Sequence, residues 1–108
     1  MQIVISVTEE DVKKSHISNF DPELHSGWNT LVRHPIAYAT RRALEEVLGE
    51  TNTDIGIQVW AKQLVVGNRK KKTPLQRIGF PEEVVETIRH YRATGDMKPF
   101  TFTLDIPV

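Results

Sequence analysis

The residues best suited to bind a ligand lie mainly in one stretch of the chain. Between residues 55 and 81 there are six basic side chains and no acidic one, although the whole chain has 14 basic and 14 acidic residues. Such a stretch gives a neutral protein a local positive field. Guanidinium groups bind phosphate, and an indole face stacks on a base. The sequence therefore predicts a ligand- or partner-binding set that consists of Arg33, Arg41, Trp60, Lys62, Arg69, Lys70, Lys71, Lys72 and Arg77.

Two other interpretations of the basic stretch stay open. Its lysines are equally well explained as the solvated end of a hairpin that only keeps the chain in solution. Aromatic side chains beside cations also bind single-stranded nucleic acid. Against the nucleic-acid interpretation, the strands lack the aromatic-rich pattern of an RNA-recognition sheet, and the net charge is zero.

Catalysis is the function class with the weakest support in the sequence. The chain has no cysteine, which excludes a thiol nucleophile, disulfides and thiolate zinc sites. Neighbouring acidic residues, such as Glu45 and Glu46, fall on exposed helix faces or in the first turn of a helix, where a structural role suffices. The sequence holds no nucleophile elbow and no glycine-rich nucleotide motif. We therefore expect a protein that is not an enzyme and has no catalytic residues.

The four histidines do not form a recognisable metal site. No two of His16, His25, His34 and His90 stand three or four residues apart, the spacing that places two metal ligands on one helix face. Exposed or capping histidines are the simpler interpretation, and His34 beside Pro35 fits the start of a helix. We therefore expect neither a metal nor a cofactor.

The elements that must position these residues follow a β-α-β-β-α-β order. Alternating apolar residues predict strands over residues 2–7, 55–59, 64–66 and 100–106. Apolar residues at helical spacing, bounded by a proline and a glycine, predict helices over residues 35–48 and 81–95. A capping box at Thr8 and Asp11 predicts a short helical turn that ends near Lys14. Residues 15–33 are expected to form an irregular loop.

This order is typical of a ferredoxin-like α+β fold. We expect one small domain over residues 1–108, with an antiparallel four-stranded sheet and two helices on one of its faces. Right-handed crossovers would place the first and last strands side by side in the centre of that sheet. The uncovered face, on or near which Gln58, Trp60, Thr101 and Thr103 would lie, must face water, a ligand or a second copy of the chain.

Four stretches of the chain form a set of motifs: Val7–Asp11, His34–Ala39, Pro81–Val85 and Gly95–Leu104. They comprise a Val-Thr-x-x-Asp turn, a Pro-Ile-Ala-x-Ala helix start, a proline-initiated helix and a Gly-x-x-x-Pro-Phe-x-Phe-x-Leu strand. In these motifs the chain resembles a group of small, mostly uncharacterised proteins encoded by bacteriophages and prophages. That group usually has cysteine where His34 stands, so the resemblance implies no thiol-based role. It implies a fold and a viral origin more than a function.

The sequence and this resemblance together predict a non-enzymatic phage-type binding protein that counters a host process, with antiviral defence as the first choice. It would capture a small phosphate-bearing ligand or the acidic surface of a host protein. The alternatives are a nucleic-acid-binding accessory protein and a structural or assembly component of a phage, and a homo-oligomer stays open. No stretch approaches the roughly 20 apolar residues of a membrane helix, and no signal pattern is present. We therefore expect no membrane partner and a location in the bacterial cytoplasm.

Overall fold

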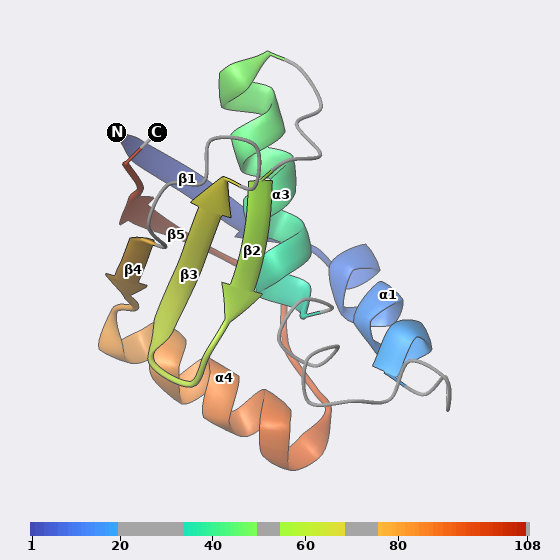
Figure 1. Ribbon diagram of the computed structural model, residues 1–108. Coiled ribbons are helices and arrows are strands. Elements are labelled where there is room, and N and C mark those ends of the chain that lie inside the picture. Colours follow the sequence, from blue (N-terminus) through green and yellow to red (C-terminus); the bar gives the residue numbers. More distant parts are fainter. Residues whose placement is uncertain (20–33, 50–54, 69–75, 108) are drawn as a thin grey trace.

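The structure is a computed structural model that describes residues 1–19, 34–49, 55–68 and 76–107. Within these ranges the chain forms three helices and two antiparallel sheets (Figure 1). In chain order the elements are β1 (Gln2–Val7), α1 (Glu9–Asn19), α3 (Pro35–Leu48), β2 (Ile55–Val59), β3 (Gln63–Asn68), β4 (Gln76–Gly79), α4 (Glu82–Thr94) and β5 (Phe100–Asp105). None of the helices in these ranges has the length and apolar character needed to cross a membrane.

The strands form two sheets, so the predicted single four-stranded, ferredoxin-like sheet is wrong. Among the described strands β1 pairs only with β5, with Gln2 opposite Asp105 and Val7 opposite Phe100. The predicted adjacency of the first and last strands is therefore confirmed, as is the α+β class. The β2–β3 hairpin takes β4 as its third strand and forms a separate sheet. Because β4 is a short, largely exposed strand with two polar residues, Gln76 and Arg77, its sequence shows no alternation that would have predicted it.

The core lies between the inward faces of the two sheets and the helices that cover them. α3 packs against both β1 and β2, and α4 lies across the end of the β2–β3 hairpin (Figure 1). β1 alternates strictly between exposed and buried residues, as a strand with one covered face must. The largest wholly buried apolar side chains are Ile3, Ile5, Ile36, Leu44, Val59, Leu64, Val84, Ile88 and Ile106.

The ends of the helices follow the local chemistry of the sequence. At α1 the Thr8 N–H donates to Asp11 Oδ2 at 2.9 Å, and the Asp11 N–H donates to Thr8 Oγ1 at 3.3 Å, which confirms the capping box. Both Gly49 after α3 and Gly95 after α4 have a φ of 75°, a left-handed conformation that favours glycine.

α1 is longer than the short turn predicted from the sequence, because it continues to Asn19. Ser15, in its middle, is wholly buried and shares a 2.7 Å hydrogen bond with the hydroxyl of Tyr91 in α4. A contact between residues 76 positions apart stabilises the helix beyond its cap, and no local pattern reveals such a contact.

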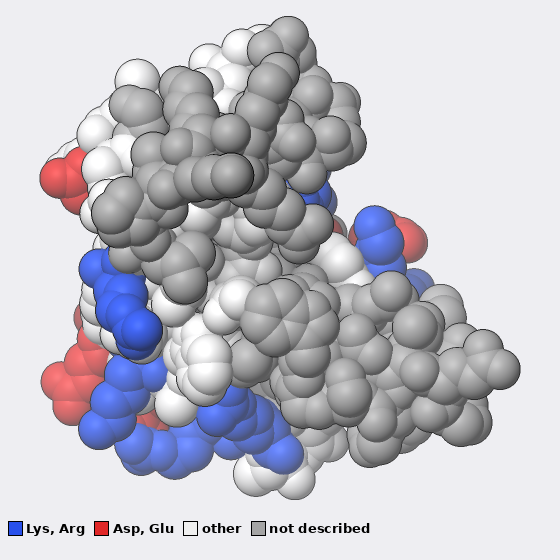
Figure 2. Space-filling model, viewed as in Figure 1, with Lys and Arg blue, Asp and Glu red and all other residues white. Residues whose placement is uncertain are grey.

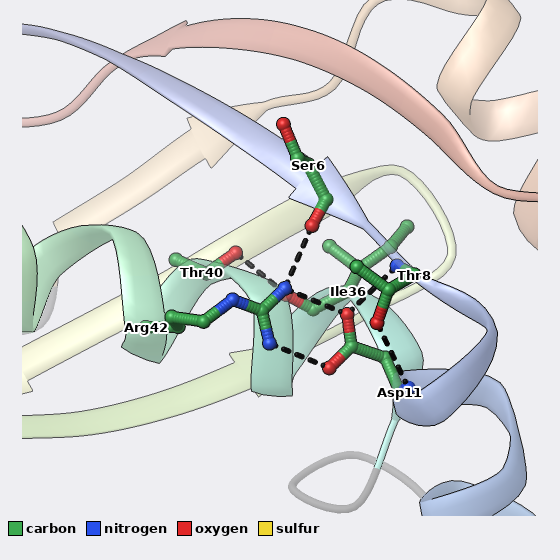
Figure 3. A network of polar contacts seen from close by, with 6 residues as sticks. All are labelled: Ser6, Thr8, Asp11, Ile36, Thr40 and Arg42. Atoms are coloured by element: carbon green, nitrogen blue, oxygen red, sulfur yellow. Dashed lines mark hydrogen bonds and ion pairs between the residues drawn. The ribbon is translucent and has the colours of Figure 1, made fainter.

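A network of polar contacts ties α1 and α3 to the end of β1 (Figure 3). The Arg42 guanidinium donates to the two carboxylate oxygens of Asp11 at 2.8 and 2.9 Å, and to the carbonyl oxygen of Ser6 at 2.8 Å. Burial alone would raise the pKa of Asp11, but hydrogen bonds from Arg42 and Thr8 outweigh that effect, so the pKa is lowered. The charges of Arg42 and Asp11 therefore hold three elements together.

Candidate anion-binding pocket

The residues of the predicted binding set fall into two groups. Five of them lie outside the described residues: Arg33, Arg69, Lys70, Lys71 and Lys72. The other four are described: Arg41 lies in α3, Trp60 and Lys62 in the turn between β2 and β3, and Arg77 in β4. Only these four can be placed relative to the rest of the fold.

Arg41 has a contact within the protein. It belongs to α3, is half-buried, and donates from Nη2 to the carbonyl oxygen of Ile55 at 2.7 Å. That carbonyl belongs to the first residue of β2, so the arginine holds the start of the strand against the helix. A ligand-binding role for Arg41 stays a prediction.

Lys62 lies in the turn between β2 and β3, and the fold brings this turn against α4. A pocket of about 110 Å³ lies at the junction, lined by Ala61, Lys62, Val85, Ile88, Arg89 and Arg92, and we call it the basic pocket. Its three charged residues are all exposed and all positive, whereas Ile88 is buried and Val85 half-buried. Figure 2 shows Lys and Arg side chains gathered along the lower edge of the molecule, where the hairpin turn meets α4.

The backbone of the β2–β3 turn is held at both ends. The Trp60 N–H donates to the carbonyl oxygen of Gln63 at 2.9 Å, which closes the turn. The Phe80 N–H donates to the carbonyl oxygen of Lys62 at 3.0 Å, which ties the turn to the connection between β4 and α4. Lys62 therefore stands on a fixed backbone beside the helix that carries the other two cations.

The three cations of the basic pocket differ in their partners. Arg89 forms an exposed ion pair with Glu86 at 2.8 Å, within its own helix. Within the part of the chain that the structure describes, no carboxylate pairs with Lys62 or Arg92. Two positive charges on an apolar surface without a negative partner attract an anion from solution.

The sequence interpretation missed Arg89 and Arg92. It considered the net charge of each segment. Residues 82–108 have five acidic and three basic residues, so their net charge is negative and gave no reason to select these arginines. A signal for them was nevertheless present, because residues three apart lie on the same face of a helix. Their meeting with Lys62 required the tertiary structure, since Arg89 and Arg92 follow Lys62 by 27 and 30 residues in the sequence.

Trp60 and Arg77 are not among the described residues that line the basic pocket. Trp60 directly follows β2, and Arg77 belongs to β4 of the β2–β3–β4 sheet. The indole Nε1 of Trp60 donates to Oε1 of Gln58 at 3.1 Å, and the side chain is 42% exposed. Across the same sheet Gln58 is paired with Val65 and Val65 with Arg77. Thr101 and Thr103 belong instead to the β1–β5 sheet. The expectation that Gln58, Trp60 and the two threonines share one open sheet face is therefore wrong, because they lie in separate sheets.

His34 has a structural role at the start of α3. Its Nδ1 accepts the backbone N–H of Ile36 at 3.1 Å, and Pro35 occupies the first helical position, as expected from the sequence. The ring lies edge-on to Tyr91, with 4.9 Å between the ring centroids, and the buried Nε2 has no hydrogen-bond partner among the residues that the structure describes. Burial and the nearby cation of Arg92 lower the pKa of His34 to about 3. The imidazole is therefore neutral at pH 7.

The remaining acidic and histidine side chains give no metal site among the described residues. His16 is engaged with the carbonyl oxygen of Gly95. A second hollow, of about 400 Å³, is lined by residues of α4 and of the connection to β5, but it has Glu86 and Asp96 together with Lys98. Because this hollow presents both signs of charge, it favours no particular class of ligand.

Comparisons with known proteins found no relative: no family model, no curated protein and no solved structure matches the chain. The resemblance to phage proteins therefore stays a prediction. The basic pocket is the candidate site that the geometry supports best.

Proposed function

We propose that this protein is a non-enzymatic binding protein that captures an anionic ligand in the basic pocket. Its biological setting is the one expected from the resemblance: a phage protein that counters a host process such as antiviral defence by occupying a ligand or a partner. The anion is either a small phosphate-bearing molecule or an acidic group on a host protein.

The observation that carries this proposal is the convergence of Lys62, Arg89 and Arg92 on one pocket. Lys62 comes from a hairpin turn and the arginines from a helix, so the cluster does not result from a local run of basic residues. Charges of one sign repel each other, and gathering them costs stability unless something compensates for the repulsion. A bound anion provides that compensation and is held by charge-assisted hydrogen bonds.

The proposal is tested by calorimetric titration of inorganic phosphate and pyrophosphate into the full chain. The double variant Lys62→Ala/Arg92→Ala should weaken binding by at least about 10-fold, because each lost hydrogen bond to a charged group contributes about 1.5–3 kcal/mol. The matched control is Lys13→Ala/Lys98→Ala, which removes the same charge from exposed positions outside the pocket. The control should retain most of the affinity.

Two results would overturn the proposal. If both double variants weaken binding equally, the anion responds to overall charge and not to the pocket. If neither does, the pocket binds no anion. A variant with Arg69, Lys70, Lys71 and Lys72 replaced by glutamine measures separately what the predicted basic segment contributes, since that segment lies outside the described residues.

A further inference from the structure

The basic pocket is small compared with sites that enclose whole ligands. Pockets for drug-sized molecules measure about 300–1,000 Å³, whereas this one measures about 110 Å³. It has room for a single charged group such as a phosphate, so the remainder of any larger ligand must lie on the surface beside it. The surface beside the pocket therefore decides which phosphate-bearing molecule binds.

On the side of the β2–β3 turn, two residues adjoin the pocket along the chain, Trp60 before Ala61 and Gln63 after Lys62, and of these Trp60 is the aromatic one. Ala61 lines the pocket and follows Trp60 directly, so the Cα atoms of Trp60 and Lys62 are at most about 7 Å apart. The indole is not among the described side chains that line the pocket, so the two are neighbours through the β2–β3 turn that carries both Trp60 and Lys62. Trp60 is also one of the few large apolar side chains in the described ranges that stay exposed.

One side-chain hydrogen bond holds the indole of Trp60, and a second hydrogen bond holds the backbone that carries it. Its Nε1 donates to Gln58 Oε1, and its backbone N–H donates to Gln63. Because the Gln58 carbonyl oxygen faces the indole, the amide nitrogen of Gln58 points away from that bond and its N–H groups can donate to the edge of a base. A fixed aromatic face with an amide donor at its side is suited to a planar heterocycle.

We propose that the ligand is a free 5′-nucleotide whose phosphate occupies the basic pocket and whose base stacks on Trp60. This inference rests on the proposed function, because it places the phosphate at Lys62 and Arg92. It adds the recognition of the base, for which Trp60 and Gln58 are responsible. A free nucleotide is favoured over a nucleic acid because the pocket accepts one phosphate and the chain has no net positive charge.

The test compares the affinities of adenosine 5′-monophosphate, uridine 5′-monophosphate, ribose 5-phosphate and adenosine for the full chain. Stacking of one base on an aromatic side chain is equivalent to a roughly 5- to 100-fold gain in affinity. The nucleotides should therefore bind at least about 5-fold more tightly than ribose 5-phosphate, and far more tightly than adenosine. Their binding should also quench the fluorescence of Trp60.

Variants of Trp60 test whether this residue causes the gain in affinity of the nucleotides over ribose 5-phosphate. Trp60→Ala should lower the affinity for the nucleotides to that of ribose 5-phosphate and leave the affinity for ribose 5-phosphate itself unchanged. Trp60→Phe should retain most of the preference, because a phenyl ring also stacks. In the Trp60→Phe protein the fluorescence change should disappear, which separates Trp60 from the other tryptophan of the chain, Trp28.

Each outcome decides between the two proposals. If nucleotides bind no better than ribose 5-phosphate, the stacking inference is overturned while the anion-binding function stands. If no phosphate compound binds, both are overturned. If a single-stranded hexanucleotide binds much more tightly than the mononucleotides, with a steep loss of affinity as salt rises, the ligand is a nucleic acid and the free nucleotide is overturned.

Discussion

Arg42 and the cations of the basic pocket use the same kind of charge in opposite ways. Arg42 meets the buried carboxylate of Asp11 and a backbone carbonyl, so its hydrogen-bonding capacity serves the fold (Figure 3). Lys62 and Arg92 have no carboxylate partner among the described residues, although they lie against an apolar surface. A basic residue with a built-in anion stabilises the protein, whereas one without such a partner is available to bind a ligand.

The largest effect is expected when this comparison is tested by truncation. Arg42→Ala should lower the free energy of unfolding by about 2–4 kcal/mol, because it leaves the carboxylate of Asp11 buried without its charged partner. Lys62→Ala and Arg92→Ala should each change it by less than about 0.5 kcal/mol, as is usual for exposed side chains. Urea denaturation at pH 7, followed by circular dichroism, measures all three variants. Equal losses for Arg42→Ala and Arg92→Ala would show that the pocket arginine is structural too.

The next largest effect concerns pH and His34, which lies near Arg92. Its pKa is about 3 in the folded chain and about 6.5 when exposed, so below pH 6.5 only the unfolded chain takes up the proton. Stability should therefore fall as the pH drops from 6.5 towards 3, with a slope that approaches about 1.4 kcal/mol per pH unit from this residue.

The variant His34→Asn isolates the contribution of His34. Asparagine can still accept the N–H at the start of α3 but does not titrate. Denaturation curves between pH 6.5 and 4 should show a flatter dependence for the variant than for the parent chain. The measurements stop at pH 4 because a second group changes the stability at lower pH. The pKa of Asp11 is lowered from 3.8 in the folded chain, so its contribution to stability is lost as the pH falls below about that value. Identical slopes for the two proteins would rule out a buried neutral His34.

The smallest effect concerns the glycines that end two helices: Gly49 ends α3, which carries Arg42, and Gly95 ends α4, which carries Arg92. Gly49→Ala and Gly95→Ala should each cost about 1–2 kcal/mol, because a φ of 75° is strained for any residue with a Cβ atom. Gly79→Ala is the matched control, since its added Cβ meets nothing within 4 Å and its φ is not positive. Thermal denaturation should rank Gly79→Ala as near neutral. A loss for Gly79→Ala as large as for the other two would contradict this explanation.

Much of the local structure could be predicted from the sequence. The capping box, the proline starts and the glycine ends of the helices depend on residues a few positions apart, and the structure confirms them. The helical spacing of α3 also predicted Val47 on the buried face, yet Val47 is 44% exposed, because its position near the end of the helix extends beyond the sheets. Periodicity predicts a face, but only packing decides how much of that face is covered.

The candidate site was predictable only in part. Lys62 was in the predicted binding set, and it lines the basic pocket together with two arginines that the sequence interpretation did not select. Arg41, by contrast, belongs to α3 and holds the backbone carbonyl of Ile55 at the start of β2. A count of charges along the chain cannot distinguish a cation that meets a partner in the fold from one that does not.

The sequence by itself determined where the helices begin, where α3 and α4 end and which strand faces are apolar, since these depend on hydrogen bonds and side-chain spacing within a few residues. Only the tertiary structure decided that the strands divide into two sheets, that α1 continues past its cap, and that a hairpin turn meets α4 at three positive charges. The physical reason is distance along the chain: these features depend on contacts between residues far apart in sequence, and such contacts leave no local pattern.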